Sequence, residues 1–351
     1  MRMMRWWPAA LLGFGLAWPA AAAPRKVIID QDAFDGTGLQ PILMLLQDPA
    51  VEVLGITIVS GDGWAPEETA TTLRMLELIG RTDVPVVQGA IYPLVNSKER
   101  NKRREALYGA LPYKGAWADP PFVPPLPKGQ PRIKAYPGSA AEFLLNMTRK
   151  HPGEISILAM GPLTNVALAQ RLDDGFAGRV KELVMEGGTL TAIGRGLDQK
   201  QDEFGMNVAY SPRMAFNMSW DPEASHIVFS TKWRRLALVT DDASASAIGT
   251  KDLLARASAG HRPVGRLVEA LAQPGFPLWD EVAVAAWIDP AVVTRRGTLA
   301  MDVDLMPGPN YGALLTWPPG QGPGLGEQDV DVIYAVDVPK VDAMFVELIG
   351  R

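Results

Sequence analysis

Three aspartates follow a short apolar run near the start of the chain. The stretch KVIIDQDAFDGTGLQ (26–40) places Asp30, Asp32 and Asp35 directly after valine and isoleucine residues. Carboxylates this close repel one another, and protonation or a bound cation relieves the repulsion. Calcium takes about six to eight oxygen ligands, often from one irregular loop together with a distant carboxylate and backbone carbonyls. The loop therefore suits calcium, although Asp30 and Asp35 could instead shape the turn and cap the next helix.

Composition restricts the chemistry further. The chain has no cysteine and only three histidines, which excludes thiolate chemistry and argues against a multi-histidine zinc site. Any metal would be a hard cation held by oxygens. The formal net charge is −5 and the basic residues are scattered, so nucleic acid is not an expected partner.

Residues 1–22 have the pattern of a secretory signal. MRMMRWWPAALLGFGLAWPAAA begins with Arg2 and Arg5 and continues with an apolar stretch too short and too interrupted by proline to span a bilayer. Ala20 and Ala22 fit a small-x-small cleavage site. We expect a protein exported to the periplasm or secreted, with no stable membrane anchor after cleavage. An uncleaved anchor is the alternative.

The rest of the chain alternates apolar strands with amphipathic helices. KVIID leads to LQPILMLLQD, VEVLGITIVS leads to EETATTLRMLELIG, and ISILAMG leads to PLTNVALAQRL. Such interleaving predicts βαβ units and an α/β fold with an open, mostly parallel, doubly wound sheet and a Rossmann-like core. No repeat or composition shift divides residues 23–351, which we expect to form a single domain.

One segment interrupts this alternation. Residues 96–138 combine a basic cluster, Lys98 to Arg104, with many prolines. Prolines exclude a regular core element, and the basic cluster is expected to be a solvated, mobile loop rather than a site for an anionic ligand.

Three later stretches add candidate ligands at the same place. In an open parallel sheet, ligands bind outside the carboxyl ends of the strands. ILAMGPLTNVALAQRL (157–172) directs the Met160 carbonyl to that edge, MAFNMSWDPEASHIVFS (214–230) has an asparagine before a helix start, and FPLWDEVAVAAWIDP (276–290) has Asp280 before an apolar helix. Each also has an ordinary structural explanation, since Asp221 and Asp280 suit helix N-caps.

Together these stretches resemble the inosine-uridine-preferring nucleoside hydrolase family over nearly the whole mature chain. EVLGITIVSGD, VPVVQGA, VMEGG, FNMSWDPEASHIVF and WDEVAVAAWIDP follow the acidic loop in the family's order. The resemblance implies one Ca²⁺ ion, hydrolysis of the N-glycosidic bond of a nucleoside or related riboside, and a possible homodimer or homotetramer.

The resemblance also assigns roles to residues. It implies Asp32 as the base that activates water, and Asp62, Asn217, Trp279 and Asp280 as substrate-binding residues. The metal ligands that it implies are Asp30, Asp32, Asp35, the carbonyl of Met160, and Asp280.

Four departures from the family pattern fall in this site. The family loop reads D-x-D-x-x-x-D-D, but its paired aspartates face Gly36, Thr37 or Gly38 here. Ala215 replaces the Glu of an E-F-N ribose-binding motif, and Asp62 stands where the family usually has Asn. Trp279 replaces a His that can assist the leaving base, and it could stack on a nucleobase or simply line the pocket.

Two functions from different classes therefore remain. The first is a calcium-dependent nucleoside hydrolase, favoured by Asp30, Asp32, Asn217 and Asp280. The second is a catalytically weak or inactive relative that binds a ribosyl or sugar ligand in the periplasm, favoured by the loss of the paired aspartates and by Ala215. Base preference would depend on residues 96–138 and 190–212, which the sequence does not interpret.

Overall fold

A single nine-stranded sheet organises the part of the chain that the computed structural model describes, residues 23–34, 36–111, 113–190 and 216–351. Its strand order is β3-β2-β1-β4-β5-β6-β9-β7-β8. All neighbouring strands from β3 to β9 run parallel, which confirms the mostly parallel doubly wound sheet. The strands are β1 (Arg25–Gln31), β2 (Val51–Ile58), β3 (Val86–Gln88), β4 (Ser156–Ala159), β5 (Glu182–Glu186), β6 (Leu236–Val239), β7 (Val293–Val303), β8 (Leu314–Trp317) and β9 (Gln328–Val336).

The apolar runs form strands because both faces of the sheet are buried. Successive strand side chains point to opposite faces, so Val27 and Ile29 pack in one core while Ile28 packs in the other. All three are fully buried. Near-continuous apolar strands are what a parallel sheet covered on both faces requires.

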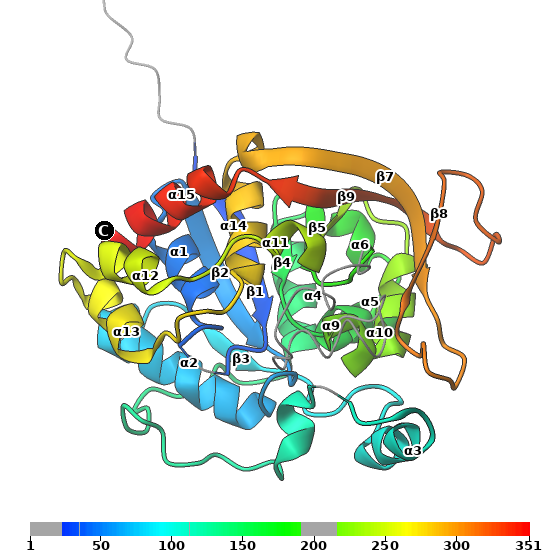
Figure 1. Cartoon of the computed structure of the whole chain (residues 1–351), viewed down its shortest axis with the longest axis horizontal. Helices are drawn as coiled ribbons and strands as arrows, with labels where there is room; N and C mark the ends of the chain where they lie inside the picture. Colours follow the sequence, from blue (N-terminus) through cyan, green and yellow to red (C-terminus); the bar gives the residue numbers. More distant parts are fainter. Residues whose placement is uncertain (1–22, 35, 112, 191–215) are drawn as a thin grey trace, which may run out of the picture.

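Helices cover the two faces in separate groups (Figure 1). Residues of α1, α2 and α12–α15 contribute to one core, and residues of α4, α5, α6 and α10 to the other. No helix in the described ranges is long and apolar enough to cross a membrane. The helices are α1 (Gln40–Gln47), α2 (Ala65–Ile79), α3 (Lys98–Tyr108), η1 (Gly115–Ala118), α4 (Ala140–Lys150), α5 (Thr164–Leu172), α6 (Phe176–Arg179), α9 (Phe216–Trp220), α10 (Pro222–Phe229), α11 (Asp241–Ser244), α12 (Lys251–Ser258), α13 (Pro263–Leu271), α14 (Trp279–Ile288), η2 (Pro290–Val292) and α15 (Val338–Gly350).

The direction of winding reverses between β1 and β4. From β1 the chain adds β2 and β3 on one side, and β4, β5 and β6 then follow on the other. Asp30 pairs with Thr57 of β2 and with Ala159 of β4, so it lies between both neighbours. Such a switch point is the preferred ligand-binding place in an open α/β sheet, and it lies where the acidic loop begins.

The last part of the sheet is antiparallel. β7 pairs antiparallel with both β8 and β9, while β9 pairs parallel with β6. Figure 1 shows β7 as a long strand that runs across the molecule beside β9. This extension broadens the sheet far from the switch point.

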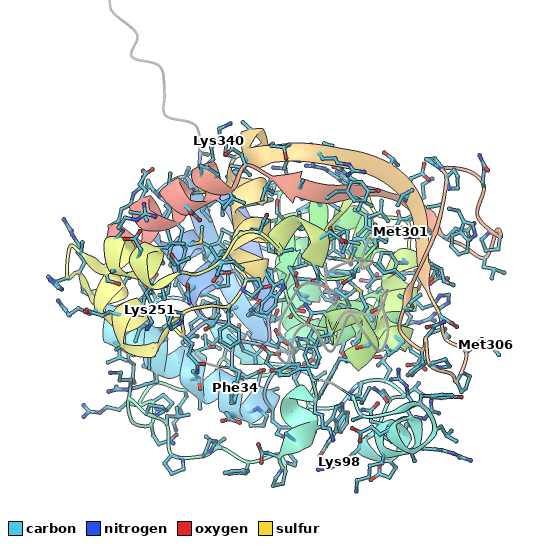
Figure 2. All side chains as sticks on the ribbon, viewed as in Figure 1. Phe34, Lys98, Lys251, Met301, Met306 and Lys340 are labelled. Carbon is cyan, nitrogen blue, oxygen red and sulfur yellow. The ribbon has the colours of Figure 1, made fainter. Side chains whose placement is uncertain are left out.

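The expectation of a mobile loop at Lys98–Arg104 is wrong. These residues lie in α3, whose N-cap Ser97 accepts a hydrogen bond from the backbone N–H of Arg100. Lysine, arginine, glutamate and alanine are strong helix formers, so a mostly exposed helix needs little more than this cap. Lys98 begins α3 at the rim of the molecule, apart from both helical layers (Figure 2).

Candidate active site

Asp30 is the most tightly held of the acidic residues. It is fully buried, and its Oδ1 accepts hydrogen bonds from Thr57 Oγ1 at 2.5 Å and Asn165 Nδ2 at 2.8 Å. Burial raises its pKa to about 6, partly offset by these two bonds. Its Oδ2 is buried and has no hydrogen-bond partner among the described residues. One oxygen is thus fixed by the fold and the other is available to a ligand.

Asp32 lies between two glycines. A Cβ at Gly61 would stand 2.0 Å from Asp32 Oδ2, and one at Gly161 would stand 2.8 Å from Asp32 Oδ1. Asp32 Oδ2 also accepts the backbone N–H of Asp62 at 3.1 Å. Burial, then the charges of Asp62 and Asp280, raise its pKa well above the ordinary value. The loops after β2 and β4 therefore approach the carboxylate closely enough to exclude any larger side chain.

Gln31 connects the acidic loop to α14. Its Nε2 donates to Asp280 Oδ2 at 2.7 Å and to the carbonyl of Gly38 at 3.4 Å. The N-cap of α14 is Leu278, and Asp280 lies in the first turn of the helix. The alternative explanation of Asp280 as an N-cap is thus wrong. Burial raises the pKa of Asp280 to about 7, and the Gln31 bond opposes that rise while Asp62 and Asp241 add to it.

Asn217 and the Met160 carbonyl are brought into direct contact. Asn217 lies on α9 and donates through Nδ2 to the carbonyls of Met160 and Glu186, both at 3.3 Å, and to Glu186 Oε2 at 3.0 Å. Glu186 was not assigned a role from the sequence. Its only signal was a carboxylate at the end of the otherwise apolar strand VME in VMEGG.

Asp62 is joined to the segment that interrupts the alternation. Tyr113 donates its hydroxyl to Asp62 Oδ1 at 3.0 Å, and its ring contacts Phe216 edge to face with centroids 4.9 Å apart. Ala116 N–H donates to the carbonyl of Gly61 at 2.8 Å. Residues 113–118 therefore pack beside the switch point and not at a distant surface.

The remaining predicted residues have different outcomes. Trp279 is the first residue of α14, partly exposed beside Asp280. Asp35 and Ala215 lie outside the described residues. Asp221 is the N-cap of α10, because its side chain accepts the N–H of Ala224 at the start of that helix. This confirms the structural alternative that the sequence offered for Asp221.

The chemistry of these donors fits a hard cation. They are oxygens, they include the unpartnered Asp30 Oδ2, and the charge of Asp62 raises the pKa values of both Asp32 and Asp280. Within the described ranges, however, no three acidic or histidine side chains are already arranged to hold a metal ion. The residues that would hold one are Asp30, Asp32, Asp280 and the Met160 carbonyl.

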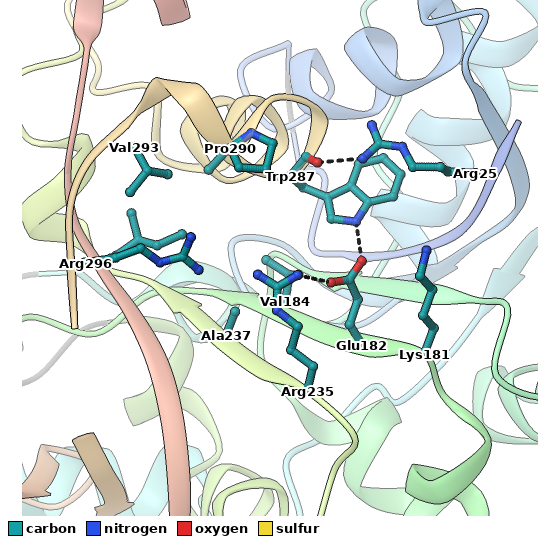
Figure 3. Close-up of a pocket in the computed structure, with 12 residues that line it drawn as sticks. Arg25, Lys181, Glu182, Val184, Arg235, Ala237, Trp287, Pro290, Val293 and Arg296 are labelled. Carbon is teal, nitrogen blue, oxygen red and sulfur yellow. Dashed lines mark hydrogen bonds and ion pairs between the residues drawn. The ribbon is translucent and has the colours of Figure 1, made fainter. Parts of the chain in front are cut away.

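A cavity of about 220 Å³ lies at the amino ends of the strands, on the side of the sheet opposite the candidate active site (Figure 3). It is lined by Arg25, Glu182 and Arg235, which stand at the amino ends of β1, β5 and β6. Arg235 pairs with Glu182 at 2.7 Å, and Arg25 donates to the Trp287 carbonyl at 2.8 Å and stacks on its ring. These groups join α14 to the sheet, so we assign this cavity a structural role.

A known family model and several known proteins match this chain. The sequence model described as inosine-uridine preferring nucleoside hydrolase matches residues 27–343. "Probable uridine nucleosidase 1" of Oryza sativa subsp. japonica is 35% identical over 206 residues, covering 59% of this chain and 55% of that protein. The chain thus spans about half the length of that curated relative.

Two further matches extend over more of the chain. An uncharacterised Schizosaccharomyces pombe protein is 30% identical over 323 residues, covering 87% of this chain and 79% of the other. The solved structure of a plant nucleoside hydrolase superposes with a TM-score of 0.73 at 23% identity, covering 93% of this chain and 99% of that one. This second likeness supports the fold.

Proposed function

The chain belongs to the inosine-uridine preferring nucleoside hydrolase family, and on this premise we propose that it hydrolyses the N-glycosidic bond of a ribonucleoside with the help of calcium. The observation that carries the proposal is the position of Asp32. It is a buried carboxylate at the switch point, enclosed by Gly61 and Gly161 and facing Asp62 and Asp280. The relative from Oryza sativa subsp. japonica is named a probable uridine nucleosidase, so uridine is the first substrate to test.

Three tasks must be performed during N-glycoside hydrolysis. A water must attack the anomeric carbon, the sugar must be stabilised as it becomes oxocarbenium-like, and the base must leave. Bound calcium would supply Lewis acidity and a fixed point for the ribose diol. Asp32 accepts the proton of the attacking water, because it is the carboxylate that the glycine loops hold in one position.

The other side chains orient and stabilise the sugar. Asn217 of α9 contacts the ends of β4 and β5, and Asp280 of α14 contacts Gln31 at the end of β1. Their neighbouring carboxylates favour positive charge on the sugar ring. Trp279 has no acidic proton to give the base, so it acts by stacking. The base then leaves with the electron pair of the N-glycosidic bond, as an anion that takes its proton from solvent.

One observation favours a second function. Asp280 Oδ2 is already engaged by Gln31 Nε2 at 2.7 Å, which competes with a metal ion for that oxygen. Together with the lost paired aspartates and Ala215, this supports a weakly active relative that binds a ribosyl ligand.

The test is ribose release by protein beginning at Ala23. Uridine, cytidine, inosine and adenosine are assayed with calcium and after chelation, with Asp32→Asn as the inactive variant and the loop variant Asp48→Asn as its control. Calcium-dependent release that Asp32→Asn lowers by about 1000-fold or more supports the hydrolase. Calcium binding without ribose release from any nucleoside would instead support the second function, a ribosyl-binding protein.

We further infer that residues 1–22 direct export to the periplasm and are then removed, and that the mature chain assembles as a homodimer or homotetramer. The basic start and the alanines before position 23 support export. Expression in a bacterial host, followed by fractionation and amino-terminal sequencing, tests it: a mature chain in the periplasmic fraction that starts at Ala23 is expected. Light scattering gives the assembly state.

A further inference from the structure

Glu186 is a buried carboxylate for which the sequence assigned no role. It is the last residue of β5, and only 4% of it is exposed. β5 lies beside β4, the strand that leads to Met160, so Glu186 reaches the same edge of the sheet as the acidic loop. Glu182, the first residue of the same strand, reaches the opposite edge.

The position of Glu186 is fixed by Asn217. Asn217 Nδ2 donates to Glu186 Oε2 at 3.0 Å and contacts the Glu186 and Met160 carbonyls at 3.3 Å. One amide thereby joins the ends of β4 and β5 to α9. The Glu186 side chain is consequently held at the wall of the candidate active site.

The other oxygen of Glu186 has no donor. Oε1 is buried and accepts no hydrogen bond from any described residue. The charged groups that act on Glu186 are themselves carboxylates: Asp241, which also shares a side-chain hydrogen bond with it, Asp280 and Asp32. A buried acceptor among acceptors is costly unless a bound molecule supplies the donor.

We propose that Glu186 accepts a hydrogen bond from a ribosyl hydroxyl through Oε1 and so selects the sugar of the substrate. The inference rests on the proposed function for its ligand class, but its geometry is independent of catalysis. Sugar hydroxyls donate without adding a charge, and a residue beside Asn217 is placed to meet them. Ala215, which precedes Phe216 in the sequence, has no carboxylate in its side chain.

The experiment compares wild type with Glu186→Gln, which keeps the shape of the side chain and removes its charge. Hydrolysis of uridine is measured beside its 2′-, 3′- and 5′-deoxy analogues in saturating calcium. We expect kcat/KM for uridine to fall by about 10- to 100-fold, the range for one hydrogen bond to a charged acceptor. For the analogue that lacks the recognised hydroxyl, it should fall less than about threefold, because the partner is already absent.

A binding measurement makes the result independent of turnover. Calorimetric titration of D-ribose into the calcium-loaded protein should show weaker binding to Glu186→Gln, with calcium affinity unchanged. Glu182→Gln, on the same strand at the opposite edge, should leave sugar discrimination as in wild type. If wild type hydrolyses nothing but its ribose binding still depends on Glu186, the proposed function fails and this inference stands.

Three outcomes would overturn the inference. An equal loss of kcat/KM for uridine and all three analogues would give Glu186 a structural role. A loss confined to calcium affinity would make it a metal ligand. Failure of wild type to bind either ribose or nucleoside would remove the ligand class itself.

Discussion

Asp30 depends on two side chains from neighbouring elements. Thr57 of β2 and Asn165 of α5 both donate to its Oδ1, which leaves Oδ2 as the oxygen that a ligand can use. Asn165 also donates to the Ile58 carbonyl at 3.1 Å and accepts the Ala90 N–H at 2.9 Å. A single amide thus orients the candidate metal ligand and joins three segments of the fold.

Asn165→Ala should therefore weaken calcium binding. Loss of a side chain that orients a ligand typically lowers metal affinity by about 10- to 100-fold. The unpaired groups it leaves should also lower the free energy of unfolding by about 1 to 3 kcal/mol. Calorimetric titration with calcium and urea unfolding measure the two effects.

Gln170→Ala is the matched control. Gln170 lies on the same helix, but its amide contacts Asp174 and Ala177, away from the acidic residues. It should leave calcium affinity unchanged. A folded Asn165→Ala protein with wild-type calcium affinity would contradict the assignment of Asp30 as a ligand.

At the scale of elements, the loops after β2 and β4 determine the place of Asp32. Gly61 follows β2 and Gly161 follows β4, and each allows its backbone to approach the carboxylate. The Gly61 carbonyl also accepts the N–H of Ala116 from η1. The β2 loop therefore contacts both Asp32 and η1.

Gly61→Ala should reduce activity much more than stability. The added Cβ would stand 2.0 Å from Asp32 Oδ2, so either the carboxylate or the loop must move. A displacement of about 1 Å costs on the order of 100-fold in rate, which we expect in kcat. Gly178→Ala is the control, because nothing lies within 4 Å of a Cβ there. Unchanged kcat in Gly61→Ala would exclude Asp32 as the base.

The buried N-cap residue Asp221 makes the stability of the folded chain depend on pH. It is fully buried and accepts hydrogen bonds from Thr164 Oγ1, Leu94 N–H and Ala224 N–H. Burial raises its pKa from 3.8 to about 6, partly offset by these bonds. Between about pH 4 and 6 the folded chain holds a proton at Asp221 that the unfolded chain has released, so stability falls as pH rises.

Asp221→Asn removes this titration. The stability of wild type relative to the variant should decrease by about 2 to 3 kcal/mol from pH 4 to pH 6 and then remain level. Asp173→Asn should show the opposite slope at lower pH, because Arg149 and Arg179 hold the pKa of Asp173 at about 2. Urea unfolding at each pH measures both, and a pH-independent difference at Asp221 would refute the expectation.

At the scale of the whole molecule, the site gathers buried carboxyl groups whose burial costs free energy of folding. Glu68, Glu186 and Glu281 are buried beside the aspartates, and burial followed by neighbouring negative charge raises the pKa of each. Two extensive apolar cores on either side of the sheet supply the stability that permits this. A cation at the site would relieve the repulsion and stabilise the folded state.

Calcium should therefore raise the melting temperature. At a concentration about 100 times Kd, binding to the folded state alone adds about 2.7 kcal/mol, which corresponds to several degrees. Scanning calorimetry in calcium and in chelator measures the shift, and Asp30→Asn should abolish it. Equal melting temperatures in both buffers, with no calcium heat on titration, would rule out the metal.

The sequence by itself determined the class of fold and the edge of the sheet that carries the chemistry. Apolar runs such as KVIID and ISILAMG, interleaved with amphipathic helices, indicate a parallel sheet covered on both faces, and chain direction then brings Asp30, Asp32 and Met160 to one edge. Asn217 and Asp280 were placed there by resemblance, and the fold brings them to that edge. These properties are local or follow from connectivity, so the order of residues is enough.

Only the tertiary structure decided which side chains meet. The sequence assigned no role to Gln31, yet it contacts Asp280, 249 residues away in the chain. Glu186 was only the last residue of a predicted strand until the fold placed Asn217 against it. Residues 98–104 were predicted as a loop because the segment 96–138 is rich in proline, but those prolines all follow α3. Such contacts depend on which strands are neighbours and how far each loop reaches, and no pattern along one chain specifies these distances.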